Sequence, residues 1–136
     1  MDYWTNQKLN CARTTCSAVL KYYGCEEYMD PLSDAFIPFG GGIGEGYVCG
    51  VVLGGLASIS LVLRKKGLEP KVVLTHCNDF KRKFTETETY LECNELLKPF
   101  ATENGKLPLE APGRKEYCTE IIKKAVAIIQ QIIDEA

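Results

Sequence analysis

The chain has 136 residues, which is the size of one domain, and we expect a single domain over residues 1–136. Its apolar share of 46% and charged share of 25% are ordinary for a globular protein, and its net charge of −2 excludes a strongly basic surface for nucleic acid. Seven cysteines accompany a single histidine. Because seven is odd, disulfide pairing alone would leave one thiol over.

The first ten residues, MDYWTNQKLN, lack the basic and then apolar regions of a secretory signal. We therefore expect a cytoplasmic protein whose thiols stay reduced. No two cysteines form a Cys-x-x-Cys pair, which removes the usual signatures of zinc ribbons, thioredoxin-type motifs and c-type haem attachment. A metal site in this chain would have to be assembled from elements that are distant in sequence.

The first third of the chain shows helical spacing followed by glycines. Residues 10–23 are expected to form a helix, with Asn10 as its N-cap and Gly24 just beyond its end. A shorter helical stretch is expected over residues 31–38. The segment GGGIGEG at 40–46 matches neither the dinucleotide fingerprint nor the phosphate-loop pattern, so it does not indicate phosphate binding.

Residues 46–63 carry no charge and are followed by Arg-Lys-Lys. The length of this run would allow a membrane span, but its four glycines and two serines favour the central helix of a bundle, with no membrane partner. Small residues recur at every fourth position, which would let another helix or a cofactor approach the backbone closely. These residues are Gly46, Gly50, Gly54 and Ser58.

The second half of the chain is also expected to be helical. Residues 71–83 read as a helix or a mixed segment, because their valines could equally begin a strand. Thr89 and Glu92 fit a capping box that would start a further helix. A loop is expected over 104–113 and the clearest helix over 114–134. The prediction is an all-α bundle of about five helices with a central glycine-rich helix.

Four cysteines fall at or near the starts of expected helices: Cys11, Cys49, Cys93 and Cys118. Unpaired amides and partial positive charge at a helix N-terminus lower the pKa of a thiol and favour thiolate, the form that binds metals and attacks disulfides. Free cysteine is also commonly buried, so the spacing alone leaves a functional site and four core residues equally open. Cys16, Cys25 and Cys77 are expected to be core or incidental, and His76 beside Cys77 reads as an incidental polar pair rather than an extra ligand.

The cysteines stand in recognisable segments: NCA at 10–12, FGGGIGEGYVCGVVLG at 39–54, Cys93 before NELL, and Cys118 at the start of an amphipathic helix. This pattern resembles the redox-active family named C_GCAxxG_C_C for its cysteines, which occurs in bacteria and archaea, and the resemblance covers nearly the whole chain. Two departures are mild: Val51 stands in place of the usual alanine, and Tyr47-Val48 precedes Cys49 where a glycine is common.

The resemblance implies that the family's four cysteines correspond to Cys11, Cys49, Cys93 and Cys118. A similar domain occurs in split-Soret cytochrome c, a haem protein that also holds an iron–sulfur cluster. Because this chain lacks the haem-attachment motif, only the cluster is implied. We therefore expect those four cysteines to ligate a 2Fe–2S cluster, with backbone approach allowed by Gly42, Gly44, Gly46 and Gly50.

Three other functions use the same residues differently. The protein could be a metal-free thiol–disulfide enzyme in which two of the cysteines act as attacking and resolving thiols. It could be a zinc module, because four thiolates suit zinc as well as iron, or a helical interaction domain with buried cysteines. An unidentified redox partner protein is also expected. The apolar central and last helices also permit a homodimer.

Overall fold

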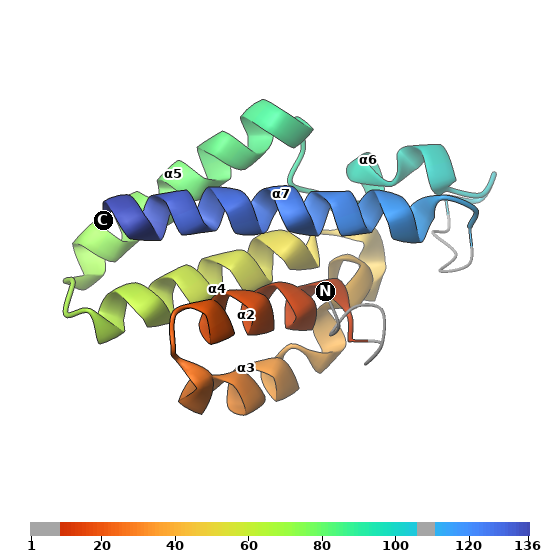
Figure 1. Cartoon of the computed structure of the whole chain (residues 1–136). Helices are drawn as coiled ribbons and strands as arrows, with labels where there is room; N and C mark the ends of the chain where they lie inside the picture. The colour runs from red at the N-terminus through yellow and green to blue at the C-terminus, as the bar shows by residue number, and fades with distance from the viewer. Residues whose placement is uncertain (1–8, 106–110) are drawn as a thin grey trace.

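The computed structural model describes residues 9–105 and 111–136, and most of these residues lie in helices (Figure 1). Five helices in this part of the chain have seven residues or more, and its one β-type pairing is an isolated antiparallel bridge between Val48 and Glu92. The predicted all-α class is therefore confirmed. The helices are α2 (Cys11–Tyr22), α3 (Met29–Ala35), α4 (Gly50–Lys65), α5 (Pro70–Glu88), the short α6 (Cys93–Leu96) and α7 (Arg114–Glu135).

Helix α4 is the centre of the bundle, as its composition predicts. It packs against α2, α5 and α7. Because neighbouring helices surround it, it does not need a polar face toward water. The hydroxyl of the buried Ser58 donates to the carbonyl of Gly55 at 3.0 Å, which satisfies the polar group inside the helix itself. No helix in the described residues is long and apolar enough to cross a membrane.

Helices α2 and α4 approach each other closely through two glycines. A Cβ atom on Gly54 would overlap the carbonyl oxygen of Ala12, and a Cβ atom on Gly50 would lie 2.5 Å from Sγ of Cys11. The small-residue spacing therefore does allow a neighbouring helix to reach the α4 backbone. The starts of α2 and α4 are thereby fixed beside each other.

Helix α5 extends beyond the expected range of 71–83, and no part of that range forms a strand. It begins with Pro70 at its first turn and buries Val73, Cys77, Phe80 and Phe84, which recur three or four residues apart along one face. Thr89 ends this helix as its C-cap, with φ of 75°, so the expected capping box between Thr89 and Glu92 is wrong. The Thr-x-x-Glu pattern was misleading because it overlaps the end of one helix.

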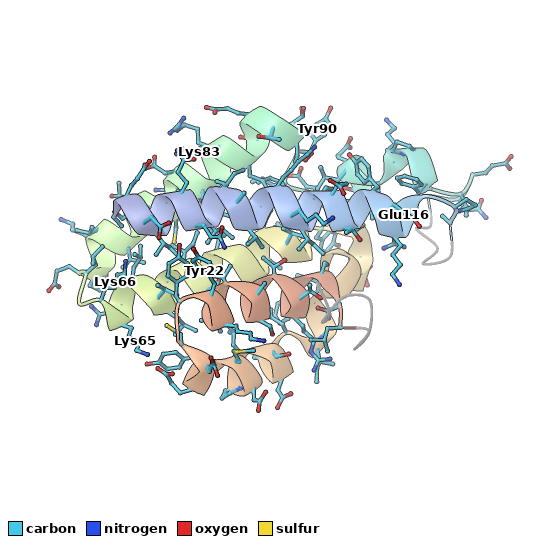
Figure 2. All side chains as sticks on the ribbon, in the orientation of Figure 1. Tyr22, Lys65, Lys66, Lys83, Tyr90 and Glu116 are labelled. Atoms are coloured by element: carbon cyan, nitrogen blue, oxygen red, sulfur yellow. The ribbon has the colours of Figure 1, made fainter. Side chains whose placement is uncertain are left out.

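Helix α7 confirms the clearest sequence prediction, with Ile122, Ala125, Ile129 and Ile133 fully buried against the rest of the core. Its start lies at the end of the bundle opposite Lys65 and Lys66. Figure 2 shows these lysines at one end and Glu116, in the first turn of α7, at the other. The expected loop at 104–113 falls partly outside the described residues.

The three cysteines predicted to be core or incidental are all buried, Cys16 in α2, Cys25 after the end of α2 and Cys77 in α5. Cys16 donates to the carbonyl of Arg13 at 3.4 Å, and Cys25, after the left-handed Gly24, donates to the carbonyl of Tyr23 at 3.6 Å. Cys77 lies in the core. Burial raises the pKa of Cys16 to about 11, as expected for a thiol that packs as a small hydrophobe.

Candidate functional site

Helices α2, α4 and α7 all begin at the same end of the bundle, and α6 lies beside them (Figure 1). One cavity of about 770 Å³ opens at this end. The four cysteines selected from the sequence line this cavity, and each belongs to a different helix start: Cys11, Cys49, Cys93 and Cys118. The fold therefore brings together side chains that are far apart in the sequence.

Asn10 fixes the start of α2 and with it Cys11. Its Oδ1 accepts a hydrogen bond from the backbone N–H of Arg13 at 2.9 Å, which is the predicted N-cap. Its Nδ2 donates to the carbonyls of Phe36 and Ile37, both at 3.0 Å. One amide side chain thus joins the helix start to the loop that forms another wall of the cavity.

A pair of backbone hydrogen bonds joins the segment that ends at Cys49 to the segment that ends at Cys93. The N–H of Cys49 donates to the carbonyl of Leu91 at 2.7 Å, and the N–H of Cys93 donates to the carbonyl of Tyr47 at 2.6 Å. These bonds flank the Val48–Glu92 bridge. Cys49 is the N-cap residue of α4 rather than part of its first turn, and its backbone N–H is bonded to Leu91.

The glycine segment forms the third wall of the cavity, and its glycines are favoured by positive φ angles and, at Gly42 and Gly46, by close contacts. Gly44 and Gly46 line the cavity, and a Cβ atom on Gly42 would lie 2.9 Å from Cβ of Cys93. Gly42, Gly44 and Gly46 all have positive φ, which glycine adopts without strain. Gly50 leaves room for the Cys11 sulfur, so all four glycines named from the sequence border the cavity or a cysteine in it.

Cys11 is the acidic thiol of the site. The Cys49 thiol donates a hydrogen bond to its sulfur, which is the largest influence and lowers the pKa of Cys11 to about 7 against the opposing effect of burial. Backbone groups of Gly41 and Ala12 add to the lowering. The same hydrogen bond and burial raise the pKa of Cys49 well above its usual value.

The other two thiols are neutral at neutral pH. Burial raises the pKa of Cys93 to about 11 and also raises that of Cys118, and negative charge on Cys11 adds to both shifts. The expectation that all four helix starts would favour thiolate is therefore wrong for three of them. Desolvation inside the cavity outweighs the partial charge of a helix end.

Arg114 is a site residue that the sequence reasoning missed. It is the first residue of α7, its exposed fraction is 7%, and it lines the cavity. Its guanidinium hydrogen-bonds Cys118 and favours the ionised form of that thiol and of Cys93. The available signal was its spacing of four residues from Cys118, which places both on one helix face.

The donor set of the cavity is four thiols, which is the ligand chemistry of iron–sulfur clusters. In the ranges that the structure describes, no three His, Cys, Asp or Glu side chains converge as ligands of one metal ion. A structural zinc site needs four donors around one point. A 2Fe–2S cluster takes its thiolates in pairs on two irons, so a spread of four thiols around a cavity of about 770 Å³ fits its chemistry.

Comparison with known proteins agrees with the cysteine pattern. The model of a family described as "Putative redox-active protein (C_GCAxxG_C_C)" matches residues 9–132, a range that contains all four cavity cysteines. An uncharacterized protein of Archaeoglobus fulgidus is 28% identical over 134 residues, which cover 90% of this chain and 83% of that protein. No solved structure gives a significant match.

Proposed function

The chain belongs to the redox-active C_GCAxxG_C_C family, and from that premise we propose that it transfers electrons or senses redox state through a 2Fe–2S cluster. The ligands would be Cys11, Cys49, Cys93 and Cys118. The observation that carries this proposal is that four thiols from four separate helix starts line one cavity. Such a cluster, when bound, exchanges single electrons.

The residues around the cavity would each contribute to binding. Cys11 is ionised near neutral pH, whereas the other three thiols would release their protons on ligation, because only thiolate binds iron. The positive-φ glycines keep side chains out of the space. Apolar side chains of Val51, Leu96 and Ile121 line the remaining wall and would limit water access, which tunes a reduction potential.

Anaerobic purification of the full chain tests the cluster directly. We expect visible absorption with iron and acid-labile sulfide in equal amounts, and loss of both in Cys93→Ser and Cys118→Ser. Cys16→Ala and Cys77→Ala are matched controls, because these cysteines lie in the core and outside the cavity. Protein without iron or colour, or with zinc alone, would contradict the proposal.

A second function is favoured by one specific contact, the hydrogen bond between Cys49 and Cys11. An acidic thiol beside a second thiol is the arrangement used for disulfide exchange. The Cys11 thiolate would attack one sulfur of a substrate disulfide and expel the other as thiolate. The Cys49 sulfur, after losing its proton, would then attack Cys11 and release the second substrate thiol. The protein would thereby give two electrons to the substrate and form a Cys11–Cys49 disulfide.

Oxidised glutathione added to metal-free protein distinguishes this function from the first. Exchange predicts a Cys11–Cys49 disulfide in the peptide map of the wild type and a trapped glutathione adduct on Cys11 in Cys49→Ser. The core variant Cys16→Ala should behave as the wild type does. Absence of both products at pH 8 would exclude exchange by this pair, and the cluster proposal would be unaffected.

A further inference from the structure

The side chain of Asn10 joins the start of α2 to residues 36–41, the wall segment, which contributes to the lining of the cysteine cavity. Its Nδ2 donates to the carbonyls of Phe36 and Ile37, both at 3.0 Å, while its Oδ1 accepts from the N–H of Arg13 at 2.9 Å. Capping of the helix uses only the amide oxygen. The two hydrogen bonds from Nδ2 therefore have a separate effect, which is to hold the wall segment against the helix start.

The wall segment reaches the sulfur of Cys11. A Cβ atom on Gly40 would lie 3.0 Å from Cβ of Asn10, so the backbone of Gly40 packs directly on the asparagine side chain. The backbone of the next residue, Gly41, hydrogen-bonds the Cys11 sulfur. Both glycines and Cys11 line the cavity. Asn10, the wall segment and the thiol thus form one continuous set of contacts.

The glycine part of this wall has little stiffness of its own. Phe36 packs in a small core cluster against α2, which fixes the beginning of the wall segment. Residues 40–42 are three glycines in succession, and glycine has the greatest backbone freedom of all residues. Their position therefore depends on the contacts that they make, and the contact of Gly40 with Asn10 is one of these.

We propose that Asn10 is a specificity-determining residue, which holds the wall segment beside Cys11 and so restricts access to that thiol to small molecules. The inference rests on the second proposed function, in which Cys11 attacks a substrate disulfide. It names the substrate class as disulfides of low molecular weight rather than those on the surface of folded proteins. Asn10 acts through the wall segment and not on the reacting sulfur, so it is a positioning residue.

Two neutral maleimides of different size test this in the metal-free full chain. N-methylmaleimide is small and a poly(ethylene glycol) maleimide is bulky, and both react with thiolate through the same ring. The ratio of their rates at Cys11, measured by peptide mapping, therefore cancels the ionised fraction of the thiol. In the wild type we expect the ratio of small to bulky reagent to exceed that of a free cysteine peptide by about tenfold or more. A ratio equal to that of the peptide would overturn the proposal.

Two substitutions at Asn10 keep the cap and remove the hydrogen bonds to the wall segment. Asn10→Asp has nearly the same shape but no N–H to donate, and Asn10→Ser has a capping hydroxyl that is too short to reach both carbonyls. Both should lower the ratio at Cys11 most of the way to the peptide value. A folded variant of either kind that keeps the wild-type ratio would refute the role of Asn10. If neither variant folds, the wild-type ratio still decides whether access to Cys11 is restricted.

Tyr23→Phe is the matched control for a loss of hydrogen bonds as such. The hydroxyl of Tyr23, at the other end of α2, donates to the carbonyl of Gln130 at 3.0 Å and to Asp134 at 2.9 Å, and none of these residues lines the cavity. This variant should lose stability in urea and keep the wild-type ratio at Cys11. An equal fall of the ratio in Tyr23→Phe would show that Asn10 acts only through general stability.

Two results distinguish failure of this inference from failure of the function on which it rests. If oxidised glutathione gives neither disulfide nor adduct but the maleimide ratio depends on Asn10, disulfide exchange fails and the restricted access to Cys11 stands. If exchange occurs and the maleimide ratio equals that of the peptide, exchange stands and the role of Asn10 is refuted.

Discussion

The sulfur of Cys11 lies against the backbone of Gly50, where a Cβ atom would be 2.5 Å away from it. Gly50→Ala is therefore expected to displace Cys11, even though alanine is the better helix former. Overpacking at this contact should lower the free energy of unfolding by about 1 kcal/mol or more. Urea unfolding measures this, and Ser60→Ala on the same helix should have little effect. A more stable Gly50→Ala variant would contradict the contact.

The reactivity of Cys11 should depend on pH with a midpoint set by Cys49. Alkylation of Cys11 by iodoacetamide is expected to reach half its maximal rate near pH 7, because its pKa is about 7. Cys49→Ala removes the hydrogen bond that lowers this pKa, so the rate at pH 7 should fall by about tenfold or more. Cys77→Ala is the control. A midpoint that stays near pH 7 without Cys49 would refute this cause.

The same low pKa links Cys11 to stability. In the unfolded chain this thiol keeps its proton until about pH 9, whereas in the native protein it loses it near pH 7. The unfolded state therefore binds more protons between these values, and the stability of the metal-free protein should rise as pH increases from 7 to 9. Urea unfolding across this range, compared with Cys11→Ser, isolates the contribution. An equal pH dependence in both proteins would contradict it.

Asn10 should stabilise the fold in two ways, as the N-cap of α2 and through its hydrogen bonds to Phe36 and Ile37. Asn10→Ala loses the cap and two hydrogen bonds to the carbonyls of Phe36 and Ile37, so we expect a loss of about 2–3 kcal/mol. Asn10→Ser keeps a capping hydroxyl but is too short to reach both carbonyls, and should lose about half as much. Equal stabilities of the two variants in urea would show that the loop contacts contribute nothing.

Ile43 stands at φ of 64°, a backbone conformation that is costly for a β-branched residue. Its side chain is 45% exposed, so little packing is lost when it is replaced. Ile43→Asn should raise the free energy of unfolding by about 1 kcal/mol, because asparagine tolerates this conformation. Ile43→Val keeps the branched Cβ and should show no gain. A stabilised valine variant would point to a different cause.

Where a helix begins or ends at a local sequence signal, that boundary could be predicted from the sequence. Asn10 and Gly24 mark the two ends of α2 because a cap and a left-handed residue act within one turn. The end of α5 could not be read in this way. Threonine is a common N-cap residue, so the sequence pattern places Thr89 at the start of a helix. In the structure Thr89 instead has a positive φ at the end of α5, which the local sequence does not indicate.

The four cysteines of the cavity could be selected from the sequence, but their chemistry could not. Four helix starts and a family resemblance selected the four cysteines that line the cavity. Their pKa values depend on how deeply neighbouring segments bury them and on whether another thiol lies within hydrogen-bond reach. The same holds for Arg114, which reads as an ordinary surface charge until α6 and α7 are placed together.

The order in which the cavity walls are synthesised has a consequence for maturation. Cys11, Cys49 and Cys93 leave the ribosome before α7, which brings Cys118 and Arg114. A nascent chain that ends after α6 would expose three cysteines without the last thiol or the only cation on the described wall. The cavity with its four thiols is therefore complete only after α7 has been synthesised and has packed against α2 and α4.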